Sequence, residues 1–264
     1  MSFIRVDDLV VHYADTGPAE APVLVLVNSL GTDLRVWDAL VPALATRFRL
    51  VRYDKRGHGL TDATPEPYRM AQLAQDLAGL LDALAIKSAI VCGLSIGGMI
   101  AQSLAATRPD LVRGLVLMDT AHKIGTPEMW AERIAAIRAG GIASIADNIL
   151  VRWFSPAFHE ERQVELAGWR NMLCRVPLDG YLGCCAAIRD ADLTATTAAL
   201  TVPTLCMVGD CDGSTPPALV AELAALVPGA RLVTISGAGH LPCVERSEAV
   251  FGAMRAFLRE SGLE

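Results

Sequence analysis

Residues 92–98 read CGLSIGG and decide the fold, because they place a G-x-S-x-G motif between a buried strand and a helix. The apolar run that ends at Cys92 predicts the strand, and a helical pattern starts at Ile96. At such a junction the serine takes a strained backbone conformation, and Gly93 and Gly97 leave the room that this conformation needs. We therefore expect the hydroxyl of Ser95 to stand exposed at the edge of a sheet as a nucleophile.

The same motif predicts where negative charge would be stabilised. The backbone N–H of Ile96 opens the helix and would face an oxyanion formed on an attacked carbonyl group. A second donor is expected from the loop after an earlier buried strand, residues 28–31 (NSLG), in which the N–H of Leu30 is the candidate. The two N–H groups would form an oxyanion hole.

A serine hydroxyl is a poor nucleophile unless a histidine takes its proton and an acid fixes the tautomer of that histidine. Among the five histidines, His240 fits this role, because it lies in a glycine-rich loop after the last strand and follows serine and acid in the chain. We expect His58, in a turn after a strand, to fix its loop. His12, in an early strand, is expected to be a surface or edge residue, and nothing around His159 in the cap sequence indicates chemistry.

Three aspartates satisfy the chain order for the acid. Asp212 is favoured because it lies beyond the end of a strand, where its loop can turn toward His240. Asp119, at the end of the preceding strand, stays open as the alternative. Asp210 more plausibly caps the turn by accepting bonds from backbone N–H groups.

Strands alternate with helices along most of the chain, which predicts parallel βαβ units and a doubly wound, mostly parallel sheet of the α/β class. The alternation stops between residues 121 and 193, where four helical segments follow one another, so we expect an inserted helical cap over a core made of residues 1–120 and 194–264. The four cap helices are expected at 127–139, 142–153, 160–173 and 178–188. Another helical pattern covers 37–44.

Composition limits the partners. The chain has 264 residues, a net charge of −6 and a pI near 5.4, without a run of basic residues, which argues against nucleic acid and anionic membranes. The N-terminus does not resemble a signal peptide, and no apolar stretch is long enough to span a membrane. Seven scattered cysteines indicate reduced thiols. We expect a cytoplasmic protein that binds a small molecule and needs no metal or cofactor; the sequence does not indicate an oligomeric state.

These features together resemble the α/β-hydrolases over the whole chain. Within that superfamily the sequence is similar to the 3-oxoadipate enol-lactonases of bacterial aromatic catabolism. The stretches that match the enol-lactonases are 28–34 (NSLGTDL), 93–99 (GLSIGGM), 152–154 (RWF) and 180–190 (GYLGCCAAIRD), while 54–59 (DKRGHG) belongs to the wider α/β-hydrolase resemblance. The resemblance implies that a Ser95-His240-Asp212 triad opens the lactone ring of 3-oxoadipate enol-lactone through an acyl-enzyme, a step of the β-ketoadipate pathway.

That substrate carries a free carboxylate, so its pocket should contain a cation or several hydrogen-bond donors. Of the basic residues in the cap, Arg133 is favoured because it lies one helical turn after Trp130. Trp130 and Trp153 would form an apolar wall. The alternatives are a general carboxylesterase or a carbon–carbon bond hydrolase with the same triad, a haloperoxidase-like side activity, or a non-catalytic ligand-binding protein on this fold.

Overall fold

An eight-stranded sheet forms the centre of the structure, a computed structural model that describes residues 2–264. The strands lie in the order β1-β2-β4-β3-β5-β6-β7-β8; β2 is antiparallel to both of its neighbours, and the strands from β4 to β8 are parallel to one another. This confirms the predicted doubly wound, mostly parallel sheet. The strands are β1 (Ser2–Val6), β2 (Leu9–Thr16), β3 (Val23–Val27), β4 (Arg49–Tyr53), β5 (Ala89–Leu94), β6 (Val112–Met118), β7 (Thr204–Gly209) and β8 (Arg231–Ile235).

Hydrophobicity explains which strands are central. Every residue of β5 and β7 is buried, whereas the edge strands β1 and β8 leave most of their residues exposed or half-buried. A strand covered on both faces must be apolar throughout, which is why these runs were recognisable in the sequence.

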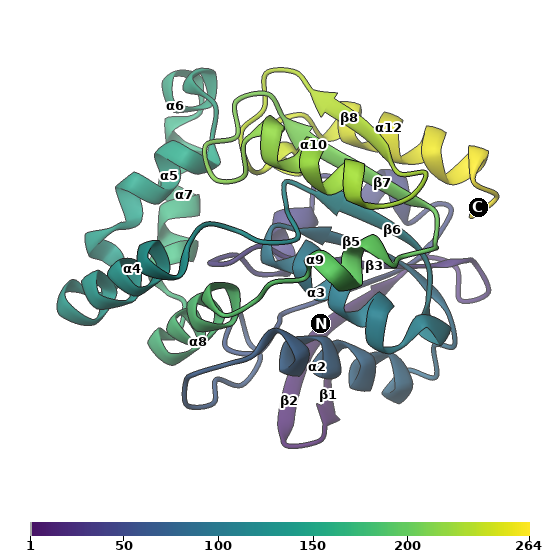
Figure 1. The fold of residues 1–264 in the computed structure, drawn as a ribbon, viewed down its shortest axis with the longest axis horizontal. Helices are drawn as coiled ribbons and strands as arrows, with labels where there is room; N and C mark the ends of the chain where they lie inside the picture. Colours follow the sequence, from purple (N-terminus) through teal and green to yellow (C-terminus); the bar gives the residue numbers. More distant parts are fainter. Residues whose placement is uncertain (1) are drawn as a thin grey trace.

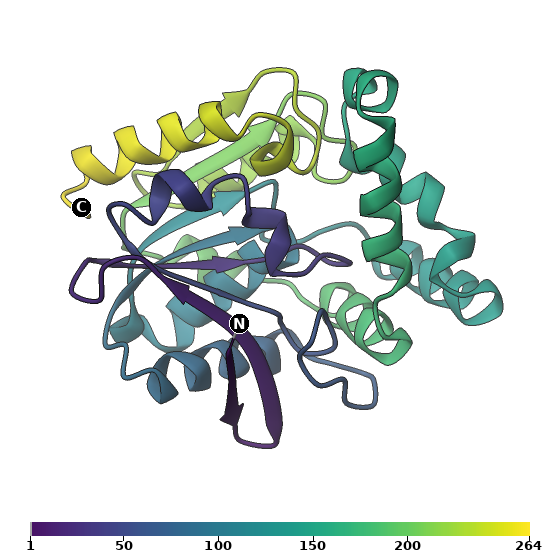
Figure 2. The ribbon, with the colours of Figure 1, turned by 180° about the vertical axis from the view of Figure 1, so that it is seen from behind.

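Helices cover both faces of the sheet. Figure 1 shows α2, α3, α9 and α10 on one face, and Figure 2 shows α1 and α12 on the opposite face. The core helices are α1 (Val41–Leu44), α2 (Met70–Ala83), α3 (Ile96–Thr107), α9 (Thr194–Ala198), α10 (Pro217–Leu226), α11 (Pro242–Glu245) and α12 (Ser247–Glu260), with 3-10 turns η1 (Leu34–Trp37) and η2 (Pro109–Leu111).

Five of the six α-helices between β6 and β7 lie together at one end of the sheet (Figure 1). They are α4 (Pro127–Gly140), α5 (Ala146–Trp153), α6 (Pro156–Glu161), α7 (Gln163–Cys174) and α8 (Leu178–Arg189), with the 3-10 turn η3 (Ile142–Ser144). We propose that they form the cap, with the boundaries 121–193 expected from the sequence.

Three predicted helices differ from the structure. The segment 37–44 divides into η1 and the short α1, because Pro42 inside one continuous helix would clash with the carbonyl group four residues before it. The prediction of one helix over 160–173 is wrong. α6 begins at Pro156 with Ser155 as its N-cap, and the non-helical backbone of Arg162 separates α6 from α7. The segment 142–153 opens as η3 before α5.

The cap and the core approach each other closely at two glycines. A Cβ atom on Gly180 of α8 would lie 2.0 Å from the carbonyl oxygen of Gly57 in the core. Near this contact the N–H of Tyr68 donates to the carbonyl oxygen of Gly183 at 3.3 Å, and Arg138 of α4 pairs with Glu66 at 2.7 Å. The position of α8 on the core therefore depends on glycine at both residues.

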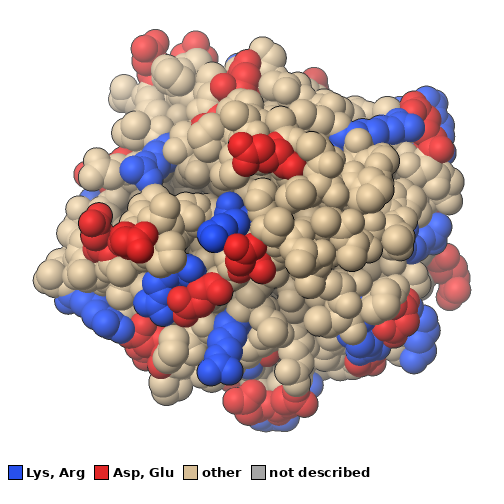
Figure 3. All heavy atoms as spheres, viewed as in Figure 1, with Lys and Arg blue, Asp and Glu red and all other residues tan. Residues whose placement is uncertain are grey.

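Charged side chains of both signs are interspersed on one face of the molecule (Figure 3). On the face drawn in Figure 3, basic and acidic side chains lie in small mixed groups between neutral areas, without a continuous basic surface. Among residues 2–264, no helix is both long enough and apolar enough to cross a bilayer.

Candidate active site

Ser95 lies in the sharp turn between β5 and α3. Its φ and ψ angles of 58° and −120° are rare for a residue with a side chain. The turn is possible because two glycines clear the space: a Cβ on Gly93 would lie 2.2 Å from the carbonyl oxygen of Gly97, and a Cβ on Gly97 would lie 2.1 Å from that of Val27. The hydroxyl of Thr120, which the sequence did not single out, donates to the carbonyl oxygen of Ser95 at 2.6 Å.

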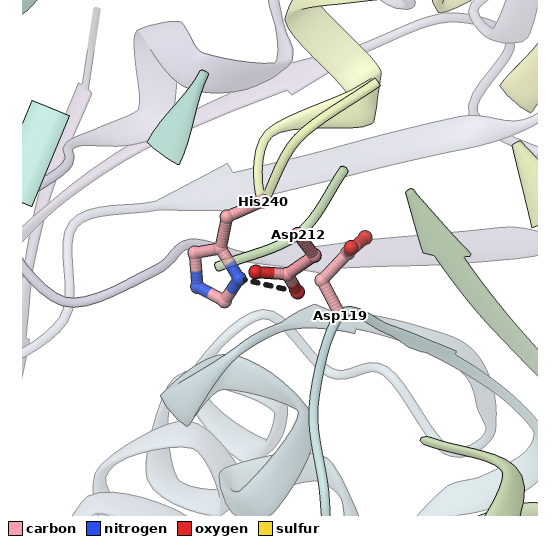
Figure 4. A group of neighbouring side chains, drawn as sticks. All are labelled: Asp119, Asp212 and His240. Atoms are coloured by element: carbon pink, nitrogen blue, oxygen red, sulfur yellow. Dashed lines mark hydrogen bonds and ion pairs between the residues drawn. The ribbon is translucent and has the colours of Figure 1, made fainter. Parts of the chain in front are cut away.

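His240 and Asp212 are hydrogen-bonded to each other. Nδ1 of His240 lies 2.9 Å from Oδ2 of Asp212, and both side chains are buried (Figure 4). The hydroxyl of Thr215 donates to Oδ2 of Asp212 at 2.6 Å, and the N–H groups of Ser214 and Thr215 donate to Oδ1 at 2.7 and 3.1 Å. With Nδ1–H donating to the carboxylate, Nε2 of His240 is left free to accept a proton.

The charge of Asp212 is maintained against its burial. Burial alone raises the pKa of this carboxyl, but the charge of His240 and the hydrogen bonds from His240, Thr215 and Ser214 bring the pKa below its usual value. Asp212 is therefore ionised at neutral pH, as a residue that orients and stabilises an imidazolium must be.

Asp119 lies behind Asp212 and has different surroundings. In Figure 4 its carboxyl group points away from the imidazole ring of His240. Oδ1 accepts a bond from the N–H of Gly209 at 2.9 Å, whereas Oδ2 is buried without a partner in the described part of the chain. Burial, and then the negative charge of Asp212, raise the pKa of Asp119 well above its usual value. These surroundings favour the neutral form of the Asp119 carboxyl group.

Asp119, Asp212 and His240 each bring one polar atom within 4.8 Å of the others, and residues of these types also bind metal ions. The N–H and O–H groups directed at both oxygens of Asp212 match a carboxylate that orients a histidine. Asp210 lies apart from this group, and its Oδ1 accepts bonds from the N–H groups of Gly237 and Ala238 at 2.7 and 3.3 Å.

One cavity of about 90 Å³ brings most of the predicted site residues together. Ser95, His240 and Leu30 line it from the core, and Trp130, Arg133 and Trp153 line it from the cap. Ile96 is buried beside it as the first residue of α3, and Asp212 lies behind His240. A larger cavity of about 660 Å³ lies elsewhere, between the 32–35 and 54–60 loops and α7, and none of these site residues lines it.

The cap side of the site is apolar and basic. The guanidinium carbon of Arg133 lies 5.1 Å from the centroid of the Trp130 ring, and Nε1 of Trp130 donates to the carbonyl oxygen of Ile124 at 2.6 Å. Within residues 2–264, no carboxylate pairs with Arg133 or with Arg152, a second arginine that lines the cavity. Arg133 and Arg152 could therefore both bind an anion in the cavity, because no carboxylate of the described chain is paired with either of them.

Sequence reasoning missed several residues of this cavity. Arg152 lies in the matching stretch 152–154, but its spacing did not distinguish it from the other cap arginines, and Arg133 was favoured instead. Ser29 lies in the loop that was expected to carry the oxyanion donor, and its buried hydroxyl has no partner in the part of the chain that the structure describes. Tyr181 of α8 also lines the cavity.

Comparisons with known proteins agree with this geometry. The model of the alpha/beta hydrolase family matches residues 24–253. The chain is 32% identical to 3-oxoadipate enol-lactonase 2 of Acinetobacter baylyi over 97% of this chain and 96% of that protein, and 35% identical to enol-lactonase 1 of the same organism over 74% and 73%.

Solved structures give the same result. The crystal structure of an enol-lactonase from Burkholderia xenovorans aligns with a TM-score of 0.95 at 39% identity, covering 98% of this chain and 100% of that one. A thermophilic esterase from Thermogutta terrifontis aligns with a TM-score of 0.92 at 29% identity, covering 99% of both chains. The resemblance seen in the sequence motifs is confirmed. The chain belongs to the alpha/beta hydrolase family and is a hydrolase.

Proposed function

We propose that this enzyme opens the ring of 3-oxoadipate enol-lactone to give 3-oxoadipate, in the β-ketoadipate pathway of aromatic-compound catabolism. The observation that carries the proposal is Arg133, a half-buried cation that has no acidic partner in residues 2–264 and lines the same cavity as Ser95 and His240. The enol-lactonases among the named relatives support the ring-opening reaction. All seven cysteines are free thiols, which suits the cytoplasm.

In the proposed reaction, Oγ of Ser95 attacks the lactone carbonyl carbon while Nε2 of His240 takes the hydroxyl proton. The carbonyl oxygen becomes an oxyanion between the N–H groups of Leu30 and Ile96. The ring C–O bond then breaks, and the enol oxygen leaves with a proton from His240 but stays tethered to the acyl group. A water molecule activated by His240 hydrolyses the acyl-enzyme, and the released enol ketonises to the 3-oxo acid.

The carboxylate of the substrate needs a partner because burying an unpaired charge is costly. Arg133 can donate two parallel N–H bonds to it, and a hydrogen bond to a charged group is worth about 1.5–3 kcal/mol, or roughly 10- to 100-fold in affinity. Trp130 holds the guanidinium group from its face, and with Trp153 it would form the apolar wall beside the ring.

The test compares the enol-lactone with a neutral phenyl ester for the wild-type enzyme, Ser95→Ala and Arg133→Gln. We expect Ser95→Ala to lose turnover of both substrates. Arg133→Gln should raise KM for the lactone about 10- to 100-fold and leave KM for the neutral ester unchanged, because only the lactone carries a carboxylate. Arg138→Gln is the matched control, since Arg138 lies on the same helix but outside the cavity.

The alternative is a carboxylesterase of neutral esters or a carbon–carbon bond hydrolase, and the esterase from Thermogutta terrifontis gives the first of these a structural precedent. An enzyme that cleaves the neutral ester and ignores the lactone would refute the proposed substrate and leave the nucleophile standing. An unchanged KM for the lactone in Arg133→Gln would remove Arg133 from the binding site.

A further inference from the structure

Lys55 is buried directly behind the loop that carries the proposed oxyanion donor. Its side chain follows β4 and is among the largest fully buried side chains in the structure. No carboxylate pairs with it among residues 2–264; instead, Nζ donates to the carbonyl oxygen of Ser29 at 2.6 Å and lies 3.5 Å from that of Thr32. A lysine without a carboxylate partner is rarely fully buried, because desolvating the ammonium group is costly.

The carbonyl oxygen of Ser29 is held by three donors. Besides Lys55, the N–H of Thr32 donates at 3.3 Å and the hydroxyl of Thr32 at 3.1 Å. The bond from the ammonium group is the shortest of the three, and a charged donor makes the strongest bond. Lys55 therefore contributes most to the orientation of the peptide group between Ser29 and Leu30.

That orientation fixes the N–H of Leu30. In a trans peptide the C=O and N–H bonds point in opposite directions, so a carbonyl oxygen held toward Lys55 turns the N–H of Leu30 away from it. Leu30 lines the same cavity as Ser95 and His240. A cation on the carbonyl oxygen also polarises the peptide group and strengthens its N–H as a donor.

The neighbouring N–H groups of the loop are already engaged. The N–H of Gly31 donates to Nε2 of His58 at 3.0 Å, and that of Thr32 donates to Ser29. Burial, and then the charge of Lys55, lower the pKa of His58 well below its usual value, so its ring is neutral and can accept this bond. In residues 2–264, the N–H of Leu30 has no protein acceptor.

We propose that Lys55 is a positioning residue that aims the N–H of Leu30 at the oxyanion by holding the carbonyl oxygen of Ser29. The inference rests on the proposed hydrolysis by Ser95 but not on the identity of the substrate. Burial lowers the pKa of Lys55 to about 8, so most molecules still carry a charged Lys55 at neutral pH.

The test measures kcat and KM for p-nitrophenyl acetate, together with the inhibition constant of an alkyl trifluoromethyl ketone. The ketone reproduces the transition state, because Oγ of Ser95 adds to its carbonyl carbon, His240 takes the proton, and the carbonyl electron pair becomes an oxyanion in the hole. The variants are Lys55→Met and Lys55→Gln, and the amide nitrogen of glutamine lies one bond nearer the main chain than Nζ of lysine does. Lys87→Met is the matched control, since Lys87 is exposed.

We expect both neutral variants of Lys55 to lower kcat about 10- to 100-fold, as a misplaced catalytic group does, with KM within twofold of the wild type. The inhibition constant of the ketone should rise by a similar factor, and Lys87→Met should change neither quantity. A purely structural role would not change kcat and the inhibition constant together. A smaller folded fraction lowers the apparent kcat, but it leaves the inhibition constant of the remaining folded enzyme unchanged.

A folded neutral variant that keeps both kcat and the inhibition constant within twofold of the wild type would overturn the proposal. If Lys55→Met does not fold, Lys55→Gln decides by the same criterion. This test does not depend on the proposed lactone substrate, because an enzyme that does not hydrolyse the lactone can still be measured with the ester and the ketone. Ester turnover that survives in Ser95→Ala would instead refute Ser95 as the nucleophile.

Discussion

Replacing Asp212 and Asp119 by asparagine, one at a time, distinguishes the proposed acid of the triad, Asp212, from the carboxyl group behind it. In Asp212→Asn the side-chain oxygen must remain at the Oδ1 position, because the N–H groups of Ser214 and Thr215 both point at it. The new amide NH2 then takes the place of Oδ2 and faces Nδ1 of His240, which is 2.9 Å away. A donor at this position forces Nδ1 to accept a bond.

The magnitude follows from the tautomer. With Nδ1 as an acceptor, the proton of neutral His240 lies on Nε2, where the ring can no longer take the proton of Ser95. In serine proteases the same exchange costs about 10⁴-fold in kcat, or about 5 kcal/mol of barrier, and we expect a loss of that order here.

Asp119→Asn should behave differently. Burial and then the charge of Asp212 raise the pKa of Asp119 and favour its neutral form, so asparagine replaces a carboxyl group in that form by a neutral group of the same shape. Its carbonyl oxygen can still accept the bond from the N–H of Gly209. Because this hydrogen bond is retained, we expect kcat at pH 7 to stay within about threefold of the wild type. A threefold change corresponds to less than about 1 kcal/mol of activation free energy.

The assay is steady-state hydrolysis of one ester at pH 7, with the folded fraction checked by thermal unfolding. The rate at which a fluorophosphonate inactivates Ser95 gives a second measure of the same proton transfer. A larger loss in Asp119→Asn than in Asp212→Asn would refute the reasoning and make Asp119 the acid of the triad.

Two further predictions concern stability. Gly180→Ala should lower the free energy of unfolding by about 1–3 kcal/mol in urea titrations, because the added methyl group would overlap the carbonyl oxygen of Gly57. Gly168→Ala is the control and should not destabilise the protein, because a Cβ atom on Gly168 meets nothing within 4 Å. Equal stability of the two variants would contradict the close contact between Gly180 and Gly57. The wild type should gain stability relative to Lys55→Met as pH rises from about 8 to 10.5, because the folded state then binds fewer protons than the unfolded state. The full gain is about 3 kcal/mol, and an unchanged difference across this range would show that the folded protein does not depress the pKa of Lys55.

The sheet could be predicted because its information is local. Apolar runs such as residues 23–27 mark strands buried on both faces, and their alternation with helices implies parallel connections. The meeting of Ser95, Asp212 and His240 follows from the same topology. These residues come after β5, β7 and β8, and the carboxyl ends of parallel strands lie at one edge of a sheet.

Contacts between residues far apart in the sequence and the exact ends of some helices could not be predicted in this way. His12 was expected to be a surface or edge residue, and this was wrong: β2 is paired on both sides, and His12 is buried with Nδ1 2.7 Å from Oδ2 of Asp54. Neither residue type reveals such a pairing, because it depends on how β2 lies against β4. The end of α6 at Arg162 is a similar case, since its sequence neighbours are compatible with a longer helix.

The loop after β4 supports the loop after β3 at several points, and this support lies in the core rather than the cap. Oδ1 of Asp54 accepts a bond from the N–H of Leu34 at 2.7 Å, while Lys55 and His58 hold the carbonyl oxygen of Ser29 and the N–H of Gly31. The candidate partner of the substrate carboxylate, Arg133, comes instead from α4 of the cap. Substitutions at Arg133 should therefore change substrate preference without moving the proposed oxyanion donors, whereas substitutions at Lys55 should lower turnover of every substrate by a similar factor.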